Sequence, residues 1–242
     1  MYYGVGIIIL AVLVWGIWAT FFTAAPSCFD GKQNGTELGV DCGGSCSLIC
    51  ANLAQDPTVL WARPFQTGPS SYTAVAYVQN NNPGAAAKGV AYSFQLFDAN
   101  NNLVVERDGV AYLPPVVTIP IIETNINVGN RTVTHVQFAF SNNPPAVWNR
   151  VPATGEVPLH VIQQNLSADA SRLSATIVND NLSDVQNVTA AAVLFDASGV
   201  ARAASKSLIT LVPGHSSASV VFTWPGGIPN IVSAQITLLP SF

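Results

Sequence analysis

The sequence predicts a mainly β protein in which two tandem antiparallel β-sandwiches follow one N-terminal transmembrane helix and a small disulfide-tied loop module. Three observations carry this prediction. The chain begins with an uncharged apolar run, all four cysteines lie in 28–50, and short strand-like segments then alternate with turn clusters. We therefore expect four parts: an anchor at 1–27, a cysteine module at 28–50, and sandwiches at 51–153 and 154–242.

The 242-residue chain is poor in charge, with 9 Lys plus Arg, 13 Asp plus Glu and a net charge of -4. Hydrophobic residues make up 49% and the mean hydropathy is +0.36, which excludes intrinsic disorder. Nine cations cannot neutralise a run of phosphates, so we expect no nucleic-acid partner. Charged residues are 9% of the chain against about a quarter in average soluble domains, which favours a surface that faces a partner.

The apolar run at 4–22, GVGIIILAVLVWGIWATFF, contains no charge, proline or amide. About twenty apolar residues span a bilayer as a helix, and the aromatic residues near the end of this run suit a membrane interface. We therefore expect an uncleaved membrane anchor at 4–22, with residues 28–242 on the extracytoplasmic side.

Two alternatives to an uncleaved anchor involve the residues around Cys28. Ala25 and Ser27 suit a signal-peptide cleavage site before Cys28, although no Lys or Arg precedes the run and the run is longer than usual. A lipid-modified Cys28 is the other alternative, and Pro26 fits its cleavage motif poorly.

The four cysteines, Cys28, Cys42, Cys46 and Cys50, predict two disulfides in an oxidising compartment. Three pairings are possible, and the spacing does not choose among them. The alternative is a zinc site with four cysteine ligands. Structural zinc sites usually have two close pairs separated by a longer loop, which this spacing does not match.

Oxygen-bearing side chains alternate with glycines between the cysteines. Asp30, Asn34, Glu37 and Asp41 could supply the oxygen ligands that calcium prefers on a tightly curved loop. In the alternative interpretation, these residues only form turns and solvate the loop, and the EF-hand pattern is not met. Calcium is the one cofactor that the sequence suggests.

The pattern C-x-D-G-x-x-N-G-x-E-x-G-V-D-C-G-G-x-C-x-x-x-C, residues 28–50, resembles a short Cys-rich motif. That motif is found near the start or in the linkers of extracellular and surface proteins of bacteria and some protists. The resemblance covers about a tenth of the chain, and it implies a surface location and no particular activity.

After residue 50, segments rich in Val, Thr, Ile, Tyr and Phe alternate with Asn-, Pro- and Gly-rich turns, which is typical of short antiparallel strands. The expected strands are 72–79, 89–98, 102–113, 131–140, 156–164, 171–179, 188–196, 201–212, 217–224 and 231–239.

The segment Leu96-Phe97-Asp98 recurs 98 residues later as Leu194-Phe195-Asp196. Upstream, 78–80 aligns with 178–180, and downstream, 113–115 aligns with 211–213. This spacing matches one seven-strand sandwich of about 100 residues, so we expect two tandem copies.

Residues 94–98, Phe-Gln-Leu-Phe-Asp, resemble the F-x-L-Y-D signature of bacterial Ig-like domains, the FxLYD family, with Phe97 in place of Tyr. The second copy keeps Leu-Phe-Asp at 194–196 but has Ala192 where the family has Phe. The resemblance implies Ig-like sandwiches. We expect Asp98 and Asp196 to form hairpin turns through their carboxylates.

No motif for nucleophilic catalysis, phosphate binding or paired-carboxylate hydrolysis is present, so we do not expect an enzyme. None of His135, His160 and His215 has a neighbour at metal-ligand spacing. We expect a membrane-anchored, exported structural, adhesive or interaction protein whose domains act as spacer or binding modules, with a protein partner at the cell envelope or surface. The alternatives are an accessory subunit of an envelope complex and a calcium-dependent ligand-binding surface protein.

Overall fold

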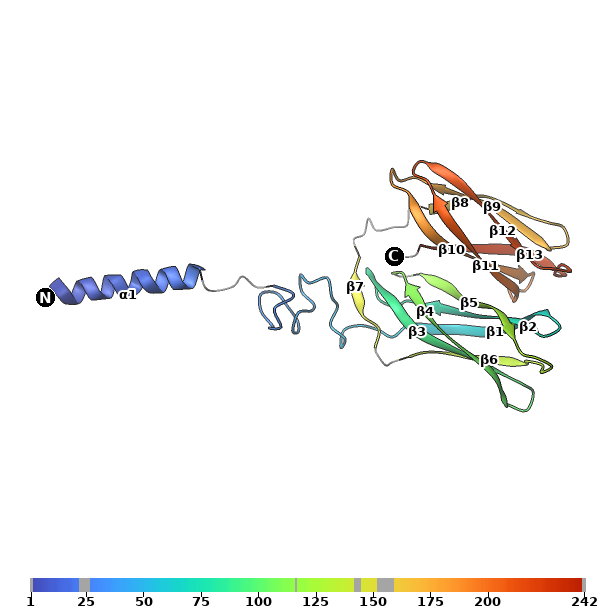
Figure 1. Ribbon diagram of the computed structural model, residues 1–242, viewed down its shortest axis with the longest axis horizontal. Helices are drawn as coiled ribbons and strands as arrows, with labels where there is room; N and C mark the ends of the chain where they lie inside the picture. Colours follow the sequence, from blue (N-terminus) through green and yellow to red (C-terminus); the bar gives the residue numbers. More distant parts are fainter. Residues whose placement is uncertain (1, 22–26, 116, 142–144, 152–158, 241–242) are drawn as a thin grey trace. The chain divides into compact units, whose positions relative to one another are not determined.

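The computed structural model describes residues 2–21, 27–115, 117–141, 145–151 and 159–240 (Figure 1). The chain divides into two compact units, Met1–Cys50 and Ala51–Phe242. The described part is mainly β, its sheets are antiparallel, and it contains two disulfides. The expected mainly β fold class is therefore confirmed.

The first unit begins with helix α1, Tyr2–Phe21. The described side chains from Tyr3 to Trp15 are exposed, because nothing in this unit packs against them. No helix among the described residues is long and apolar enough to cross a membrane. Phe22, the last residue of the expected span, lies outside those residues, so the membrane anchor stays a prediction.

The rest of the first unit, from Ser27 to Cys50, folds as loops and turns with one isolated bridge between Gly39 and Cys42. Gly44 shows why this loop needs glycine. Its φ is +56°, and an added Cβ would overlap the carbonyl oxygen of Thr36.

The second unit begins with seven described strands in two sheets (Figure 1). One sheet has the order β1-β2-β5, and the other has the order β4-β3-β6 with β7 also paired to β3. The strands are β1 Thr58–Gly68, β2 Ser71–Gln79, β3 Ala85–Phe97, β4 Leu103–Leu113, β5 Thr118–Asn127, β6 His135–Phe140 and β7 Trp148–Arg150.

Six further strands form two more sheets, in the orders β12-β9-β8 and β11-β10-β13. They are β8 Leu159–Leu166, β9 Arg172–Asn179, β10 Val185–Asp196, β11 Ala201–Val212, β12 Ser216–Thr223 and β13 Ile231–Pro240. Every described strand pairing stays within 58–150 or within 159–240. The expected boundary between 153 and 154 falls in 152–158, outside the described residues.

We call residues 58–150 the first half of this unit and residues 159–240 the second half. The two sheets of the second half face each other across one core. Leu173 and Ile177 of β9 and Phe222 of β12 pack with Val188 and Leu194 of β10. These five side chains alternate along their strands and are almost completely buried, which is the period-two pattern of a strand with one face on a core.

Strands β2 and β10 are buried on both faces. In β10, Val188 and Leu194 face the core just described, whereas Ala191 and Val193 face a second cluster with Val75 of β2. The sheets that contain β2 and β10 therefore pack directly against each other. This explains why both strands are continuous apolar runs that lack an alternating polar face.

Asn80 and Asn179 hold equivalent positions in the two halves. The side-chain amide of each bridges the turn after its own strand and a carbonyl at the end of a later strand. The predicted alignment of 78–80 with 178–180 paired Asn80 with Asp180, and it is wrong by one residue at this point. The order of the matched segments in the two halves is as expected.

The ten expected strands are present, with ends shifted by a few residues. Strands β1, β5 and β7 were not expected. Pro64 lies in β1 and Pro120 in β5, and both strands are at the edge of their sheet. Proline is tolerated at a sheet edge, but it lowers the strand signal in the sequence.

Candidate functional site

The cysteine module is held by two disulfides, Cys28–Cys46 and Cys42–Cys50. The prediction of two disulfides is confirmed, and the pairing that the spacing left open is now defined. Because all four sulfurs are bonded in pairs, a zinc site with four thiolate ligands does not form in this structure.

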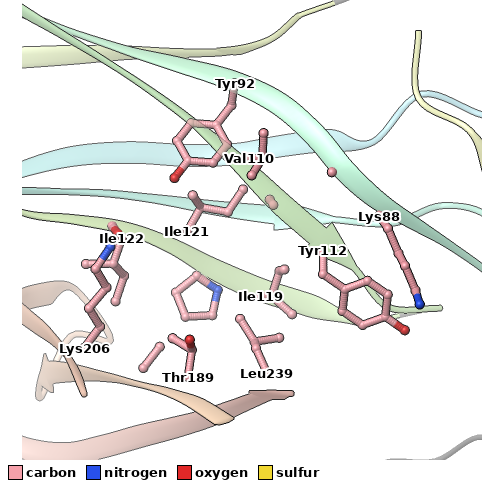
Figure 2. Close-up of a pocket in the computed structure, with 14 residues that line it drawn as sticks. Lys88, Tyr92, Val110, Tyr112, Ile119, Ile121, Ile122, Thr189, Lys206 and Leu239 are labelled. Atoms are coloured by element: carbon pink, nitrogen blue, oxygen red, sulfur yellow. Dashed lines mark hydrogen bonds between the residues drawn. The ribbon is translucent and has the colours of Figure 1, made fainter. Parts of the chain in front are cut away.

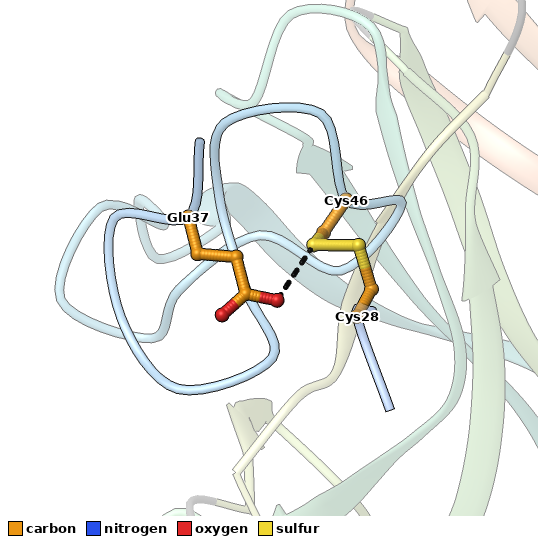
Figure 3. A group of neighbouring side chains, drawn as sticks. All are labelled: Cys28, Glu37 and Cys46. Atoms are coloured by element: carbon orange, nitrogen blue, oxygen red, sulfur yellow. Dashed lines mark hydrogen bonds between the residues drawn. A yellow bond between two sulfur atoms is a disulfide. The ribbon is translucent and has the colours of Figure 1, made fainter. Parts of the chain in front are cut away.

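Glu37 lies beside one of these disulfides (Figure 3). Its Oε1 atom is 3.4 Å from Sγ of Cys46. A disulfide sulfur has no hydrogen to donate, so this approach is a van der Waals contact. The grouping of Cys28, Glu37 and Cys46 offers one free ligand, the carboxylate, which is too few to hold a metal ion.

The four predicted calcium ligands lie in one hydrogen-bonded network. Asp41 accepts bonds from the backbone N–H groups of Asp30 and Gly31, and Glu37 accepts from those of Asn34 and Asp41. Asp30 accepts from the side-chain amide of Asn34 at 2.8 Å. These carboxylates act here as acceptors that shape the loop, as in the turn-forming alternative. Calcium binding is not tested by this arrangement, which favours the turn-forming alternative.

The two aspartates predicted to form hairpin turns do so. Asp98 Oδ1 accepts from the backbone N–H groups of Asn100 and Asn102, both at 2.9 Å. Asp196 Oδ1 accepts in the same way from Ser198 and Val200. Their outer oxygens pair with Arg131 and Arg202, respectively.

Backbone and side-chain hydrogen bonds lower the pKa values of these turn aspartates. The bond from the Asn102 N–H is the largest cause for Asp98, whose pKa falls to about 2. The bond from the Val200 N–H is the largest cause of the lowered pKa of Asp196.

The three histidines lie far apart in the sequence and have different surroundings. His135 stacks on Phe97, and Nδ1 of His160 is 3.1 Å from Oδ2 of Asp180. His215 sits in a turn with a φ of +48°. The contact between His160 and Asp180 is largely exposed to solvent, so it offers no enclosed site for chemistry.

Side chains from both halves meet between β2 and the β10 sheet. Tyr77 stacks on Trp61 with ring centroids 4.5 Å apart, and its edge meets Phe195 at 6.3 Å. Its hydroxyl donates to Oε1 of Gln235 at 3.1 Å, and burial raises the pKa of Tyr77 to about 12.

A hollow of about 310 Å³, here called the tyrosine hollow, lies beside this contact (Figure 2). Tyr92 of β3, Tyr112 of β4, Ile119 of β5 and Leu239 of β13 contribute to its lining. Figure 2 shows Lys206 and Tyr112 at opposite ends, with apolar side chains between them. The hollow has the size and the apolar character of a small-molecule site.

The polar groups at the Lys206 end are already paired with one another. Tyr92 donates to Oε1 of Glu123 at 2.7 Å, and Nζ of Lys206 lies 3.8 Å from the same oxygen. Lys206 also donates to the carbonyl of Ile122 at 2.8 Å. Burial is the largest cause of a raised pKa at Tyr92, so its hydroxyl stays protonated and keeps donating. These bonds fix the hollow and join the halves.

Sequence reasoning did not find either the tyrosine hollow or the contact at Tyr77. Glu123 and Lys206 are 83 positions apart, and Tyr77 and Gln235 are 158 apart. The available sequence signal was that β2 and β10 are apolar on both faces. This pattern indicates that both faces are covered, but it does not identify which segments cover them.

Comparison with known proteins adds little to this description. No family model matches the chain, and no curated protein matches it. Red sea bream transglutaminase is 11% identical with a TM-score of 0.23, over 76% of this chain and 29% of that one. A β-glucuronidase from glycoside hydrolase family 2 is 9% identical with a TM-score of 0.19, over 90% and 29%.

The chain thus spans less than a third of either of these structures. Similarity at this level carries no argument about fold or activity. The resemblance to the FxLYD family and the expectation that the chain is not an enzyme stay predictions.

Proposed function

We propose that this chain is an exported, membrane-attached surface protein whose two Ig-like sandwiches form one rigid spacer or binding unit. The observation that carries the proposal is the pairing of all four cysteines in two disulfides. Disulfides persist in oxidising compartments and are rare where thiols are kept reduced.

Attachment to a lipid surface through α1 is part of the proposal. The described side chains of this helix are apolar and exposed, so the first unit leaves them without an apolar neighbour. An apolar surface of this kind is stabilised by removal from water, which a lipid environment provides. The position of the paired cysteines, directly after the helix, supports placing residues 28–242 on the extracytoplasmic side.

The rigid unit is supported by the contact between the β2 and β10 sheets. Buried apolar side chains, the Tyr77–Gln235 bond and the Lys206–Ile122 bond all join the halves. A spacer that holds one domain in a fixed orientation relative to the other needs such a contact, because domains joined only by a linker rotate freely. The Ig-like assignment is supported by the resemblance at 94–98 and by the two facing sheets of the second half.

The proposal is tested on intact cells that produce the full chain. Free thiols are first blocked with a maleimide that crosses membranes, the protein is denatured and reduced, and newly released thiols are counted by mass. We expect four thiols to appear only after reduction, and externally added protease to cleave residues 28–242. Four cysteines that are already blocked before reduction, or full protection from protease, would reject export.

A further inference from the structure

A second hollow, of about 470 Å³, lies between the two halves and is here called the hydroxyl hollow. Four segments that are distant in sequence contribute to it: the β1–β2 hairpin, the bend in β5 at Thr124 and Asn125, residues 202–206 of β11, and the end of β12 with the chain that follows it, from Thr223 to Ile228. Its volume falls within the range of about 300 to 1,000 Å³ that is typical of ligand pockets.

Hydroxyl groups are the most numerous polar side-chain groups in the lining of this hollow, and those of Thr67 and Ser71 are hydrogen-bonded to each other at 3.2 Å. Six of the lining residues are Thr67, Ser71, Thr73, Thr124, Ser205 and Thr223, and the amides of Gln66 and Asn125 add to them. Each hydroxyl can both donate and accept a hydrogen bond, so the lining suits a ligand that carries hydroxyls of its own. Phe65 and Ile228 provide apolar surface for the C–H faces of such a ligand.

The cations at this hollow are already neutralised. Nε and Nη2 of Arg202 both contact Oδ2 of Asp196 at 2.6 Å, and Lys206 is held by Ile122 and Glu123. No carboxylate belongs to the described residues that line the hollow. A neutral ligand therefore fits better than an anion or a cation.

Trp224 supplies a buried donor without an acceptor. Trp224 is one of the residues that line the hydroxyl hollow, its ring packs beside Phe222 at the edge of the core, it is 3% exposed, and its Nε1–H has no hydrogen-bond partner. Buried N–H groups are paired in the great majority of proteins, and an exception calls for an unseen partner. A ligand hydroxyl in the hollow would be such an acceptor.

The backbone of β5 is distorted at the same place. Glu123 pairs with Ala74 and Ile126 pairs with Tyr72, so two residues of β5 bulge out opposite Thr73. Asn125, in this bulge, has a φ of +57°, which is unusual for a residue other than glycine. Bulges often redirect side chains toward a site, and here the bulge brings Thr124 and Asn125 to the lining.

From these observations we infer that the hydroxyl hollow is a binding site for a small neutral polyhydroxylated molecule, that is, a mono- or disaccharide. The Trp224 indole N–H and the lining hydroxyls would bind its hydroxyls. This inference does not depend on the cellular location of the chain, so its failure would leave the proposed function standing.

The test uses the full chain with ¹⁵N-labelled tryptophan, in a detergent without a sugar headgroup. Glucose, galactose, N-acetylglucosamine and trehalose are titrated separately while the indole N–H resonances are recorded. We expect at least one of them to shift the Trp224 resonance saturably and to leave that of Trp148, which does not line the hollow, unchanged.

Two variants link the shift to the site. Trp224→Phe keeps an aromatic ring but removes the donor, and Thr73→Val keeps the shape but removes a hydroxyl. We expect each to weaken saccharide binding about tenfold, as for the loss of one hydrogen bond, whereas Trp148→Phe leaves it unchanged.

Three results would overturn the inference: no saturable shift of Trp224 with any of the four sugars, undiminished binding by Trp224→Phe, or a saturable response to sodium sulfate instead of sugar. The titration of the unaltered chain can contradict the inference without any variant, so the inference stays testable even if a variant does not fold.

Discussion

Asn179 makes with Ser183 and Val212 the same pair of hydrogen bonds that Asn80 makes, 99 positions earlier, with Ala85 and Pro114. In both halves the side-chain amide donates twice to backbone carbonyls, at 2.7 to 3.0 Å. Both asparagines are almost completely buried. The same buried asparagine with the same two bonds to backbone carbonyls occurs after a strand in each half, and this supports an internal repeat.

Replacing Asn80 or Asn179 by alanine removes a buried donor and leaves two backbone carbonyls without their hydrogen bonds. We expect each variant to lower the free energy of unfolding by about 1 to 3 kcal/mol, measured by urea denaturation. Asn81→Ala is the matched control, because its amide also donates twice but is more exposed to solvent. An equal loss in all three variants would show that burial is not the reason.

Tyr77 tests whether the two halves unfold together. Tyr77→Ala removes the ring packed on Trp61 and Phe195, and we expect a loss of about 3 to 5 kcal/mol in one shared transition, measured by scanning calorimetry. Tyr77→Phe removes only the bond to Gln235 and should cost about 1 kcal/mol. If Tyr77→Ala splits off a transition for the first half while the second half melts as before, the halves are independent.

Acid should destabilise the protein through its turn aspartates. The pKa of Asp98 is lowered from 3.8 to about 2, chiefly by the Asn102 N–H, and that of Asp169 falls to about 2, chiefly by the Ser167 hydroxyl. A carboxyl with a lowered folded pKa stabilises the fold fully above its unfolded value, and this contribution is lost as the pH falls toward 2. We expect melting temperatures to drop between pH 4 and pH 2.

Asp98→Asn is the variant that checks this assignment. It removes one group that takes up a proton on unfolding, so the fall in melting temperature between pH 4 and pH 2 should become shallower. Glu106→Gln, whose pKa is also lowered but starts from 4.5, should instead change the profile at a somewhat higher pH. An unchanged slope in Asp98→Asn would reject the role given to Asp98.

Calcium would have to displace protein donors to reach the carboxylates of the cysteine module. Asp41 and Glu37 each accept backbone N–H bonds that shape the loop. We therefore expect isothermal titration of the full chain with calcium chloride to give no saturable heat, and Asp41→Ala to increase amide exchange at Asp30 and Gly31. A saturable heat that Asp41→Ala abolishes would support the calcium prediction over the turn-forming role.

The sequence was most informative where chemistry is local. The turn aspartates Asp98 and Asp196, and the grouping of Asp30, Asn34, Glu37 and Asp41, all depend on contacts within eleven positions along the chain. The short loop between the cysteines likewise made two disulfides predictable. Local hydrogen bonding leaves a readable pattern because the turn geometry fixes which neighbours meet.

The features that the sequence did not reveal depend on the three-dimensional path of the chain, either within the cysteine loop or between distant strands. The pairing of Cys28 with Cys46, the bulge at Asn125 and the contact of Tyr77 with Gln235 have no local signature. Strand β1 was missed because Pro64 weakens its pattern, although an edge position tolerates proline. The two hollows between the halves follow from how sheets stack, which periodicity alone does not define.

Strands β2 and β10 are buried on both faces, so each half needs the other half to cover one face of its sheet. Tyr77 and Val193 lie in the cluster shared by the two sheets, so either half produced alone would expose an apolar face to water. This packing therefore makes the two halves together the smallest piece that can be moved intact to another protein. We expect recombination to preserve residues 51–242 as one block.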